Sequence, residues 1–447
     1  MSEKLSCFKA YDIRGKVPSE LDEDIAYRVG RAVADQTNAK TCVVGMDIRH
    51  SSPAISTALS NGLREGGVDV IDIGLCGTEM VYFATANYGY DAGIMVTASH
   101  NPGEYNGMKI VKSESRPISG DSGLWEIERK TRERDFSRTG SGTLTKKDVY
   151  DDFVAHVLSV VDPKLIGPME VLASAGNGCA GIAVEAMESK LPLKITPMNF
   201  EPDGDFPSGV PNPILERSRA PIITRLRAGN FHYGVAWDGD YDRCFFFDEK
   251  SEFIEGYYIV GLLAQDMLMH HPGSKIVHDP RLIWNTLDIC ERLGGTPVMC
   301  KTGHAFFKEK MREVDAVYGG EMSAHHYFKH NWFCDSGMLP FLMVSRLLTK
   351  TGKPLSALVG EMMEKFPCSG ELNTHVPEAK VAIERVRAAF PGGKEDWTDG
   401  LSVEFDNWRF NVRHSNTEPI MRLNVESRGD KALVVEKSNA ILDVLNA

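Results

Sequence analysis

The chain has 447 residues, of which 42% are hydrophobic and 25% charged, as in ordinary globular proteins of about three or four domains. Its formal net charge of −12 at pH 7 argues against a general nucleic-acid or membrane-surface binder, because both need a basic face. An anionic ligand would therefore require a local cluster of arginine, lysine and backbone N–H groups.

The nine cysteines are scattered and include no Cys-x-x-Cys pair. This pattern predicts reduced thiols in a cytosol rather than a disulfide framework or a zinc site. The start of the chain has no apolar segment of the secretory type, and the longest apolar runs, such as Tyr257–Ala264, are too short to span a bilayer. We therefore expect a cytoplasmic protein.

The first predicted elements alternate between strands and a helix, which is the pattern of an α/β protein. Val43–Met46 and Val68–Ile71 are short apolar runs typical of strands, and Ala54–Gly66 between them is helix-like. A further apolar run, Ala92–Val96, predicts a buried strand.

The buried strand delivers a polar turn, Thr97–Pro102. Its serine, Ser99, is flanked by His100 and Asn101, whose imidazole and amide can hydrogen-bond a phosphate. Ser99 is therefore a candidate nucleophile or phosphate carrier. An ordinary polar turn explains these residue types equally well when the segment is considered alone.

The strand-and-turn pattern recurs three times along the chain. A strand ending in a polar turn is predicted at Val43–Arg49, Val171–Gly178 and Ile276–Arg281. Each is followed by a second strand that ends in a dense polar loop, and these loops are Thr97–Asn101, Asp238–Arg243 and Glu321–His325. We expect three related α/β domains, each presenting one functional loop at the carboxyl end of a strand.

The second of these loops follows the predicted strand Tyr233–Trp237 and carries three aspartates at alternate positions, Asp238, Asp240 and Asp242. Three carboxylates can converge on one hard cation, and with room for a phosphate oxygen they suit Mg²⁺. A solvated acidic turn is the less favoured interpretation, because like charges repel without a cation. The adjacent Arg243 could hold the same phosphate.

Polar side chains of the third loop, Glu321, Ser323 and His325, suit hydrogen bonding to sugar hydroxyls. Taken alone, the loop is slightly better explained as a polar turn rich in helix-capping residues. Smaller clusters place Tyr11 and Arg14 before a glycine turn, Lys109 ten residues after Ser99, and His304 after a strand, although each is by itself more typical of a surface or packing residue.

The last part of the chain changes character. Asp406–Arg413 alternates apolar and polar residues like a half-exposed antiparallel strand, and Ile420–Val425 and a helix-like Ala432–Leu445 follow. This pattern predicts a separate α+β domain that begins near Cys368. Its Arg413–Pro419 segment offers a guanidinium fork with hydroxyl and amide donors for an anion, although a capped turn also fits the residues.

Taken together and in this order, the motifs resemble those of the α-D-phosphohexomutase family over essentially the full length. The resemblance implies three α/β domains with mixed sheets and a C-terminal α+β domain of the TATA-box-binding-protein-like architecture, arranged around a central cleft. Four domains are expected. Residues 1–145 would carry the phosphoserine, residues 146–248 would bind the metal, residues 249–366 would bind the sugar, and residues 367–447 would bind the phosphate.

The resemblance also implies residue roles. Ser99 corresponds to the phosphoserine, and its phosphate completes the Mg²⁺ shell formed by Asp238, Asp240 and Asp242. The sugar-reading residues are Glu321, Ser323 and His325. The substrate's non-reacting phosphate would bind Arg413, Ser415, Asn416 and Thr417. Further cleft residues are Tyr11, Arg14, His100, Lys109, Arg243, Arg281 and His304, and the expected catalytic group is Ser99, Lys109, His325, Arg14 and His100.

The implied reaction interconverts mannose 6-phosphate and mannose 1-phosphate through a hexose 1,6-bisphosphate, and it supplies GDP-mannose for surface polysaccharides such as lipopolysaccharide or capsule. Lys109 and His325 are the candidates for general acid or base. We expect a small phosphosugar as the partner, a monomer or weak homodimer, and no nucleic acid or membrane. A mobile fourth domain would close over the substrate.

Alternatives remain within and outside this class. A phosphoglucomutase or a dual-specificity enzyme differs only in the C2 hydroxyl that it accepts. A metal-dependent sugar phosphatase would share Ser99 and the aspartates, and a non-catalytic sensor would be expected to lack them. Two positions depart from the family pattern: His414 stands where a small residue or proline is more usual, and Arg281 stands where some relatives carry lysine.

Overall fold

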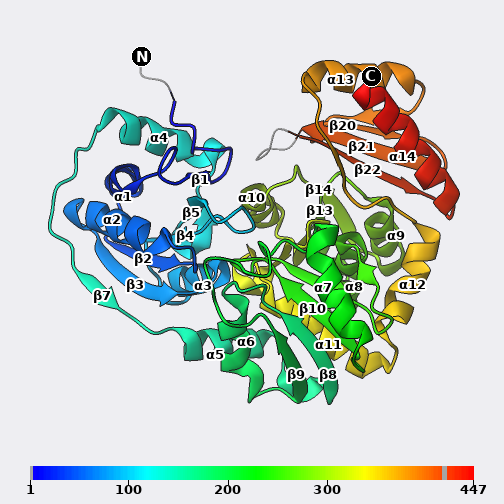
Figure 1. Cartoon of the computed structure of the whole chain (residues 1–447), viewed down its shortest axis with the longest axis horizontal. Helices are drawn as coiled ribbons and strands as arrows, with labels where there is room; N and C mark the ends of the chain where they lie inside the picture. Colours follow the sequence, from blue (N-terminus) through cyan, green and yellow to red (C-terminus); the bar gives the residue numbers. More distant parts are fainter. Residues whose placement is uncertain (1–3, 415–419) are drawn as a thin grey trace. The chain divides into compact units, whose positions relative to one another are not determined.

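The computed structural model describes residues 4–414 and 420–447 (Figure 1). The chain divides into two compact units. The first comprises the chain up to Phe253 together with His325–Gly352, and the second comprises Ile254–Ala324 and Lys353–Ala447.

The first α/β region of the first unit contains a mixed sheet in the order β1-β5-β4-β2-β3-β7. Its elements are β1 (Ile13–Lys16), α1 (Glu23–Thr37), β2 (Thr41–Met46), α2 (Ser52–Glu65), β3 (Asp69–Leu75), α3 (Thr78–Asn87), β4 (Ala92–Val96), β5 (Tyr105–Lys112), β6 (Arg116–Pro117), α4 (Leu124–Glu133) and β7 (Leu144–Lys146). Strands β3, β2 and β4 are parallel, and β5 returns antiparallel to β4.

Strand β4 is buried along its whole length, as expected of a strand covered on both faces. Helices α1 and α2 pack against each other closely, since a side chain at Gly30 or Gly62 would collide with the facing backbone. Helix α1 begins where the Asp22 carboxylate accepts a hydrogen bond from Ile25 N, and it ends at Asn38 in a left-handed conformation.

A second α/β region follows in the same unit. Its elements are α5 (Tyr150–Val160), β8 (Met169–Ser174), α6 (Ala180–Glu188), β9 (Leu193–Met198), α7 (Glu216–Arg227), β10 (Tyr233–Trp237), β11 (Cys244–Phe247) and β12 (Phe253–Ile254). Strands β9, β8 and β10 are parallel neighbours, and β11 pairs antiparallel with β10. This is the arrangement of β3, β2, β4 and β5.

The third α/β region is divided between the units. The second unit holds α8 (Gly256–His270), β13 (Lys275–His278), α9 (Trp284–Leu293), β14 (Thr296–Met299), α10 (His304–Val314) and β15 (Tyr318–Gly320). The first unit holds β16 (His326–Phe328), β17 (Cys334–Asp335) and α11 (Met338–Thr351). Strands β14, β13 and β15 are again parallel, with β13 in the middle.

The predicted threefold repetition is therefore confirmed by topology. Each region has three parallel strands, of which the first in the sequence lies between the other two. The polar loop follows the third of these strands. Two of the predicted strands, Ala92–Val96 and Tyr233–Trp237, coincide with β4 and β10.

The C-terminal region belongs to the second unit and has the predicted α+β character. It follows α12 (Leu355–Lys365), which packs on α8 of the third region. Its elements are β18 (Leu372–Thr374), α13 (Ala379–Ala389), β19 (Lys394–Asp396), β20 (Leu401–Glu404), β21 (Trp408–His414), β22 (Met421–Ser427) and α14 (Lys431–Asn446). The sheet runs β18-β22-β21-β20-β19 and is antiparallel throughout, and α13 and α14 pack together on it (Figure 1).

All nine cysteines are free, as the sequence predicts. Within residues 4–414 and 420–447, no helix combines the length and apolar character needed to cross a membrane.

Candidate active site

The serine turn begins directly after β4. Ser99 is 3% exposed and has a left-handed backbone with φ of 51°, which is uncommon for a residue with a side chain. Its N–H donates to Thr97 Oγ1 at 2.8 Å. The hydroxyl is thereby presented in a fixed, strained turn, a feature that clusters at functional sites.

The aspartate loop lies against this turn. A Cβ added to Gly239 would lie only 2.6 Å from the Ser99 carbonyl oxygen, so the close approach requires glycine. Asp238, Asp240 and Asp242 are completely buried, and each offers a carboxylate oxygen within 4.8 Å of the others. The sequence prediction that these three side chains converge is confirmed.

The Ser99 hydroxyl joins the two loops. It donates a 2.6 Å hydrogen bond to Asp238 Oδ2, and it lies 3.0 Å from His100 Nδ1. Arg243 donates to Asp238 Oδ2 through Nε at 2.8 Å and Nη2 at 2.5 Å, to Ser99 Oγ at 3.2 Å, and also contacts His100 Nδ1. A cation and a carboxylate therefore meet at the oxygen that would carry a phosphate.

Lys109, on β5, lies between the other two carboxylates. Its Nζ donates to Asp240 Oδ2 at 2.6 Å and contacts Asp242 Oδ2. Burial lowers the pKa of Lys109, but Asp240 and Asp242 outweigh burial and raise it well above its ordinary value. Lys109 is therefore a charged ammonium here, which suits the neutralisation of negative charge more than the acceptance of a proton.

The pKa values of the two outer aspartates are shifted in opposite directions. Burial raises the pKa of Asp238 to about 6, although Arg243 acts against it. Burial also raises the pKa of Asp242, but Lys109 and His325 outweigh it, so its pKa lies well below the ordinary value. Such separation within one cluster is typical of functional sites.

His325 faces the aspartate loop, with Nε2 3.5 Å from Asp242 Oδ1. The two also form a group with the buried Asp335, and one ligand atom of each lies within 4.8 Å of the others. The sequence reasoning missed Asp335, because β17 carries no motif. His325 is thus placed beside the predicted metal loop.

Arg14, on β1, lies beside the serine turn. It donates from Nη1 to Asn101 Oδ1 and from Nη2 to Asp12 Oδ2, both at 2.6 Å. Tyr11 lies half-buried three residues before it. These residues and the serine turn belong to the same compact unit.

The second unit contains the other predicted residues. Arg281 follows β13 and is 1% exposed. Its Nη2 donates to Asp279 Oδ2 at 2.8 Å and to Ser323 Oγ at 3.4 Å, and it lies 3.6 Å from Glu321 Oε1. His304, at the start of α10, is 6% exposed, and the preceding Gly303 N–H donates to Glu321 Oε1. The sugar-loop residues Glu321 and Ser323 thus share one polar cluster with Arg281.

Arginines also gather around Glu371 in this unit. Arg281 and Arg422 each lie 3.4 Å from its carboxylate, and Arg413 lies 3.7 Å from it. Burial and the neighbouring Arg281 lower the pKa of Arg413, which marks a crowded group of cations. This is the local basic cluster that the negative net charge demands of an anion-binding site.

The arginine cluster was only partly predicted. Arg422 pairs across the strands with Arg413 in the register of β21 and β22, a signal that hairpin pairing of the two predicted strands could have revealed. Glu371 has no sequence motif. Ser415, Asn416 and Thr417 lie outside the described residues.

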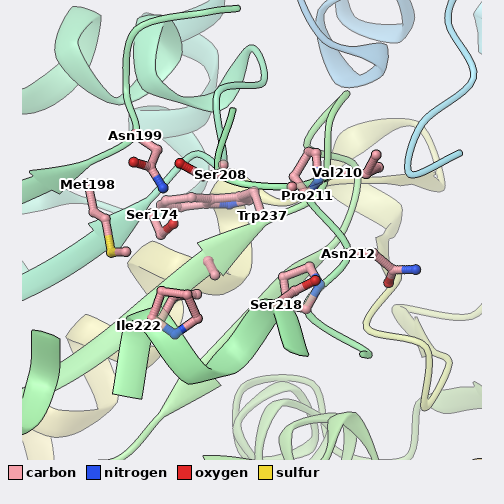
Figure 2. A pocket seen from close by; sticks show the side chains of 15 residues that line it. Ser174, Met198, Asn199, Ser208, Val210, Pro211, Asn212, Ser218, Ile222 and Trp237 are labelled. Carbon is pink, nitrogen blue, oxygen red and sulfur yellow. The ribbon is translucent and has the colours of Figure 1, made fainter. Parts of the chain in front are cut away.

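The first unit contains a cavity of about 210 Å³ at the carboxyl ends of β8 and β9. Figure 2 shows the side chains that line it. It is lined by Ser174, Gly176, Met198, Asn199, Ser208, Gly209, Val210, Pro211, Asn212, Pro213, Ser218, Pro221, Ile222, Ala236 and Trp237. None of these side chains is charged. The cavity therefore offers no cationic side chain to a phosphate, although Trp237 directly precedes Asp238.

Comparison with known proteins covers nearly the whole chain. Sequence profiles described as phosphoglucomutase/phosphomannomutase match residues 6–138 (alpha/beta/alpha domain I), 148–252 (domain II), 255–366 (domain III) and 371–443 (C-terminal domain).

Curated relatives and solved structures agree with this match. The chain is 51% identical over 445 residues to phosphohexose mutases of Xanthomonas campestris pv. campestris (strain B100), covering 99% of each chain. It is 49% identical over 456 residues to a phosphomannomutase of Escherichia coli (strain K12), covering 99% of this chain and 100% of the relative. A phosphoglucomutase/phosphomannomutase family protein from Burkholderia thailandensis has a TM-score of 0.89 at 31% identity, covering 100% of this chain and 98% of that one.

Proposed function

Because this chain belongs to the phosphoglucomutase/phosphomannomutase family, we propose that it is a phosphomannomutase that interconverts mannose 6-phosphate and mannose 1-phosphate. The reaction passes through a hexose 1,6-bisphosphate, with phosphorylated Ser99 as the phosphoryl carrier. The observation that carries the proposal is the 2.6 Å hydrogen bond from the Ser99 hydroxyl to Asp238, within a buried group of three aspartates.

The aspartate loop fits a divalent cation. Asp240 Oδ1 and Asp242 Oδ1 are buried and lack a short hydrogen bond among the described residues, although His325 Nε2 lies 3.5 Å from Asp242 Oδ1. Both oxygens are therefore available to a ligand. Oxygen donors of this kind favour Mg²⁺, and Asp238, Asp240 and Asp242 would hold it. When bound, Mg²⁺ would neutralise charge on the Ser99 phosphate.

The chain's own residues then align and neutralise the transferring group. The phosphoryl group moves from Ser99 Oγ to the free hydroxyl of the sugar phosphate, and the other phosphate of the resulting bisphosphate later returns to Ser99 Oγ. Arg243, which donates to Ser99 Oγ, supplies positive charge at the carrier, and Lys109 adds positive charge beside Asp240.

The attacking hydroxyl must lose its proton in the same step. Lys109 and His325 are both candidates for the acceptor. We favour His325, because Lys109 is already committed as an ammonium to Asp240 and Asp242. In the reverse step the protonated base returns its proton to the leaving oxygen, and this catalysis is typically worth roughly 10²–10⁴-fold.

We propose that substrate recognition uses the second unit. Glu321 and Ser323 read sugar hydroxyls, and Arg413 and Arg281 bind the non-reacting phosphate, with Ser415, Asn416 and Thr417 as further donors. The guanidinium groups of Arg413 and Arg281 are within 4 Å of the same carboxylate, Glu371. Planar forks of this kind suit bidentate phosphate binding.

A phosphoglucomutase or dual-specificity enzyme is the second candidate, since one relative bears the broader name phosphohexose mutases. Measurement of kcat/KM with mannose 1-phosphate and glucose 1-phosphate decides between them. We expect the mannose substrate to be preferred, and a clear preference for glucose 1-phosphate would overturn the assignment. Release of inorganic phosphate as the main product would instead indicate a phosphatase.

We further propose that the enzyme acts in the cytoplasm as a monomer or weak homodimer, on a small phosphosugar and without nucleic acid or membrane. Its product would feed GDP-mannose synthesis for lipopolysaccharide or capsule. Light scattering across a range of protein concentrations tests the assembly, and a stable tetramer would contradict it.

A further inference from the structure

We propose that Arg49 is a positioning residue for the phosphoryl carrier, and that it fixes the Ser99 turn through the main-chain carbonyl groups of that turn. The inference rests on the proposed function, since it assigns Arg49 to the same phosphoryl transfer. Arg49 touches no reacting atom, and its side chain approaches the turn from the side of the backbone.

The guanidinium of Arg49 uses its donors almost entirely on the serine turn. Nη2 donates to the carbonyl oxygens of Ser99 at 2.8 Å and Asn101 at 2.6 Å. Nη1 donates to the carbonyl oxygens of Pro102 at 2.6 Å and Tyr105 at 3.0 Å. Three carbonyl groups of the serine turn and the carbonyl group of Tyr105, at the start of β5, therefore point at one cation.

Arg49 is itself held rigidly. Its Nε donates to Asp47 Oδ2 at 3.1 Å, and Asp47 Oδ1 accepts from Arg49 N and from Ser52 Oγ. Asp47 N in turn donates to Val96 O, at the end of β4. The guanidinium also lies over the ring of Phe206, 5.5 Å from its centroid. Because Arg49 is only 1% exposed, water cannot compete for its hydrogen bonds.

The backbone of the serine turn has carbonyl groups that need hydrogen-bond donors from outside the sheet. Ser99 has a left-handed backbone, and the loop between β4 and β5 exposes carbonyl groups that the sheet does not pair. A buried carbonyl group requires a donor, and the guanidinium supplies one to the buried Ser99 carbonyl group while also binding the partly buried carbonyl groups of Asn101 and Pro102. The position of Ser99 Oγ between Asp238 and Arg243 then depends on Arg49.

Phosphoryl transfer is sensitive to such positions, because it depends mainly on alignment and charge. A lysine at position 49 would keep the charge, but one ammonium cannot span four carbonyl groups in a plane. We therefore expect the loss of Arg49 to affect the chemical step and to leave substrate binding largely intact, since none of these hydrogen bonds involves the residues proposed to bind the sugar phosphate.

The test uses the full-length enzyme with Arg49→Lys and Arg49→Met. Arg138→Lys is the matched control, because Arg138 also clamps two carbonyl groups of the same region, those of Ala34 and Ala39, away from the serine turn. We expect Arg49→Lys to lower kcat by about 100-fold, the cost of a small misplacement of a reacting group, with KM within about threefold of wild type. Arg138→Lys should keep both constants near wild type.

Two further readouts separate the possible failures. The transfer of phosphate from a hexose 1,6-bisphosphate to the enzyme should be slowed in Arg49→Lys by a similar factor while Mg²⁺ still raises its Tm as in wild type. If Arg49→Lys matches Arg138→Lys in kcat, or if its loss tracks only the unfolded fraction, the positioning role is wrong. If wild-type enzyme itself takes up no phosphate, the proposed function fails instead, whatever Arg49 does.

Discussion

The hydroxyl of Ser99 donates to the carboxylate of Asp238 over 2.6 Å, although the two residues are 139 positions apart in the sequence. This hydrogen bond joins the serine turn after β4 to the aspartate loop after β10, which are equivalent loops of two repeated regions. The repetition of the fold thus places the proposed phosphoryl carrier beside the aspartate loop.

Two groups of side chains could hold a metal ion: the three aspartates of the aspartate loop, and Asp242 with His325 and Asp335. Metal-dependence measurements distinguish them. We expect Asp240→Asn to raise the Mg²⁺ concentration needed for half-maximal activity by on the order of 100-fold, because a charged ligand becomes neutral. Asp335→Asn is the matched control, since Asp335 is equally buried and belongs only to the group with Asp242 and His325. A larger effect of Asp335→Asn would move the cation to that second group.

In the absence of metal, the positive charge of Lys109 offsets the negative charges of Asp240 and Asp242. Lys109→Met leaves the carboxylates of Asp240 and Asp242 buried without this cation, so we expect a loss of about 3–5 kcal/mol in the free energy of unfolding of the metal-free protein. Added Mg²⁺ should raise the Tm of this variant more than that of wild type. Lys112→Met, at the exposed end of the same strand, controls for the loss of a lysine, and equal Mg²⁺ shifts in all three proteins would contradict this role.

We expect the buried carboxyl group of Glu79 to make the stability of the protein depend on pH. Its buried carboxylate accepts hydrogen bonds from Ser336 Oγ and from the N–H groups of Gly337 and Met338, at the start of α11. Burial raises the pKa of Glu79 to about 8. Because the folded-state pKa lies above the ordinary value, this contribution to stability is complete below about pH 4.5 and is lost as pH rises through 8.

The Glu79→Gln variant keeps an acceptor oxygen and removes this titration. We expect the stability of wild type relative to Glu79→Gln to fall by up to about 5 kcal/mol between pH 4.5 and a pH above 8. Denaturant unfolding at several pH values measures the difference, with the exposed Glu23→Gln as a control. Parallel pH profiles for wild type and Glu79→Gln would rule out the shifted carboxyl.

We expect Arg413 to contribute mainly to the binding of the substrate's phosphate. It is 4% exposed and lies with Arg281 and Arg422 around Glu371. The loss of a charge-assisted contact costs about 1.5–3 kcal/mol, so we expect Arg413→Ala to raise KM by about 10- to 150-fold with a smaller change in kcat.

Arg428→Ala serves as the comparison for Arg413→Ala, because Arg428 is exposed in the same region and stacks on Trp284. Its KM should stay close to that of wild type. Unchanged steady-state constants in Arg413→Ala would remove this arginine from the substrate site.

Strands were predictable where the sequence is unbroken and apolar. Ala92–Val96 and Tyr233–Trp237 coincide with β4 and β10, because each is a short buried run followed by a polar loop. Strand ends that lie next to turns were predicted less accurately. The strand predicted to begin at Asp406 is β21, which begins at Trp408, because Asp406 and Asn407 form the bend before it. The expected domain boundaries at 145, 248 and 366 stay predictions.

The predicted site residues share a local motif, whereas the missed ones act through distant partners. Arg49 ends a recognised strand-and-turn segment, but the carbonyl groups that it binds begin 50 positions later. Glu371 and Asp335 likewise meet their neighbours only in the folded chain. Sequence reasoning therefore identified the groups suited to the chemistry, and the structure adds residues that hold or surround them.

The most direct test of the phosphoserine mechanism is intact-mass spectrometry of the enzyme before and after incubation with a hexose 1,6-bisphosphate. We predict the gain of one phosphate on wild type and none on Ser99→Ala, followed by loss of that phosphate to added mannose 1-phosphate with formation of bisphosphate. A wild-type enzyme that gains no phosphate at Ser99, or that releases it only to water, would contradict the proposed mutase.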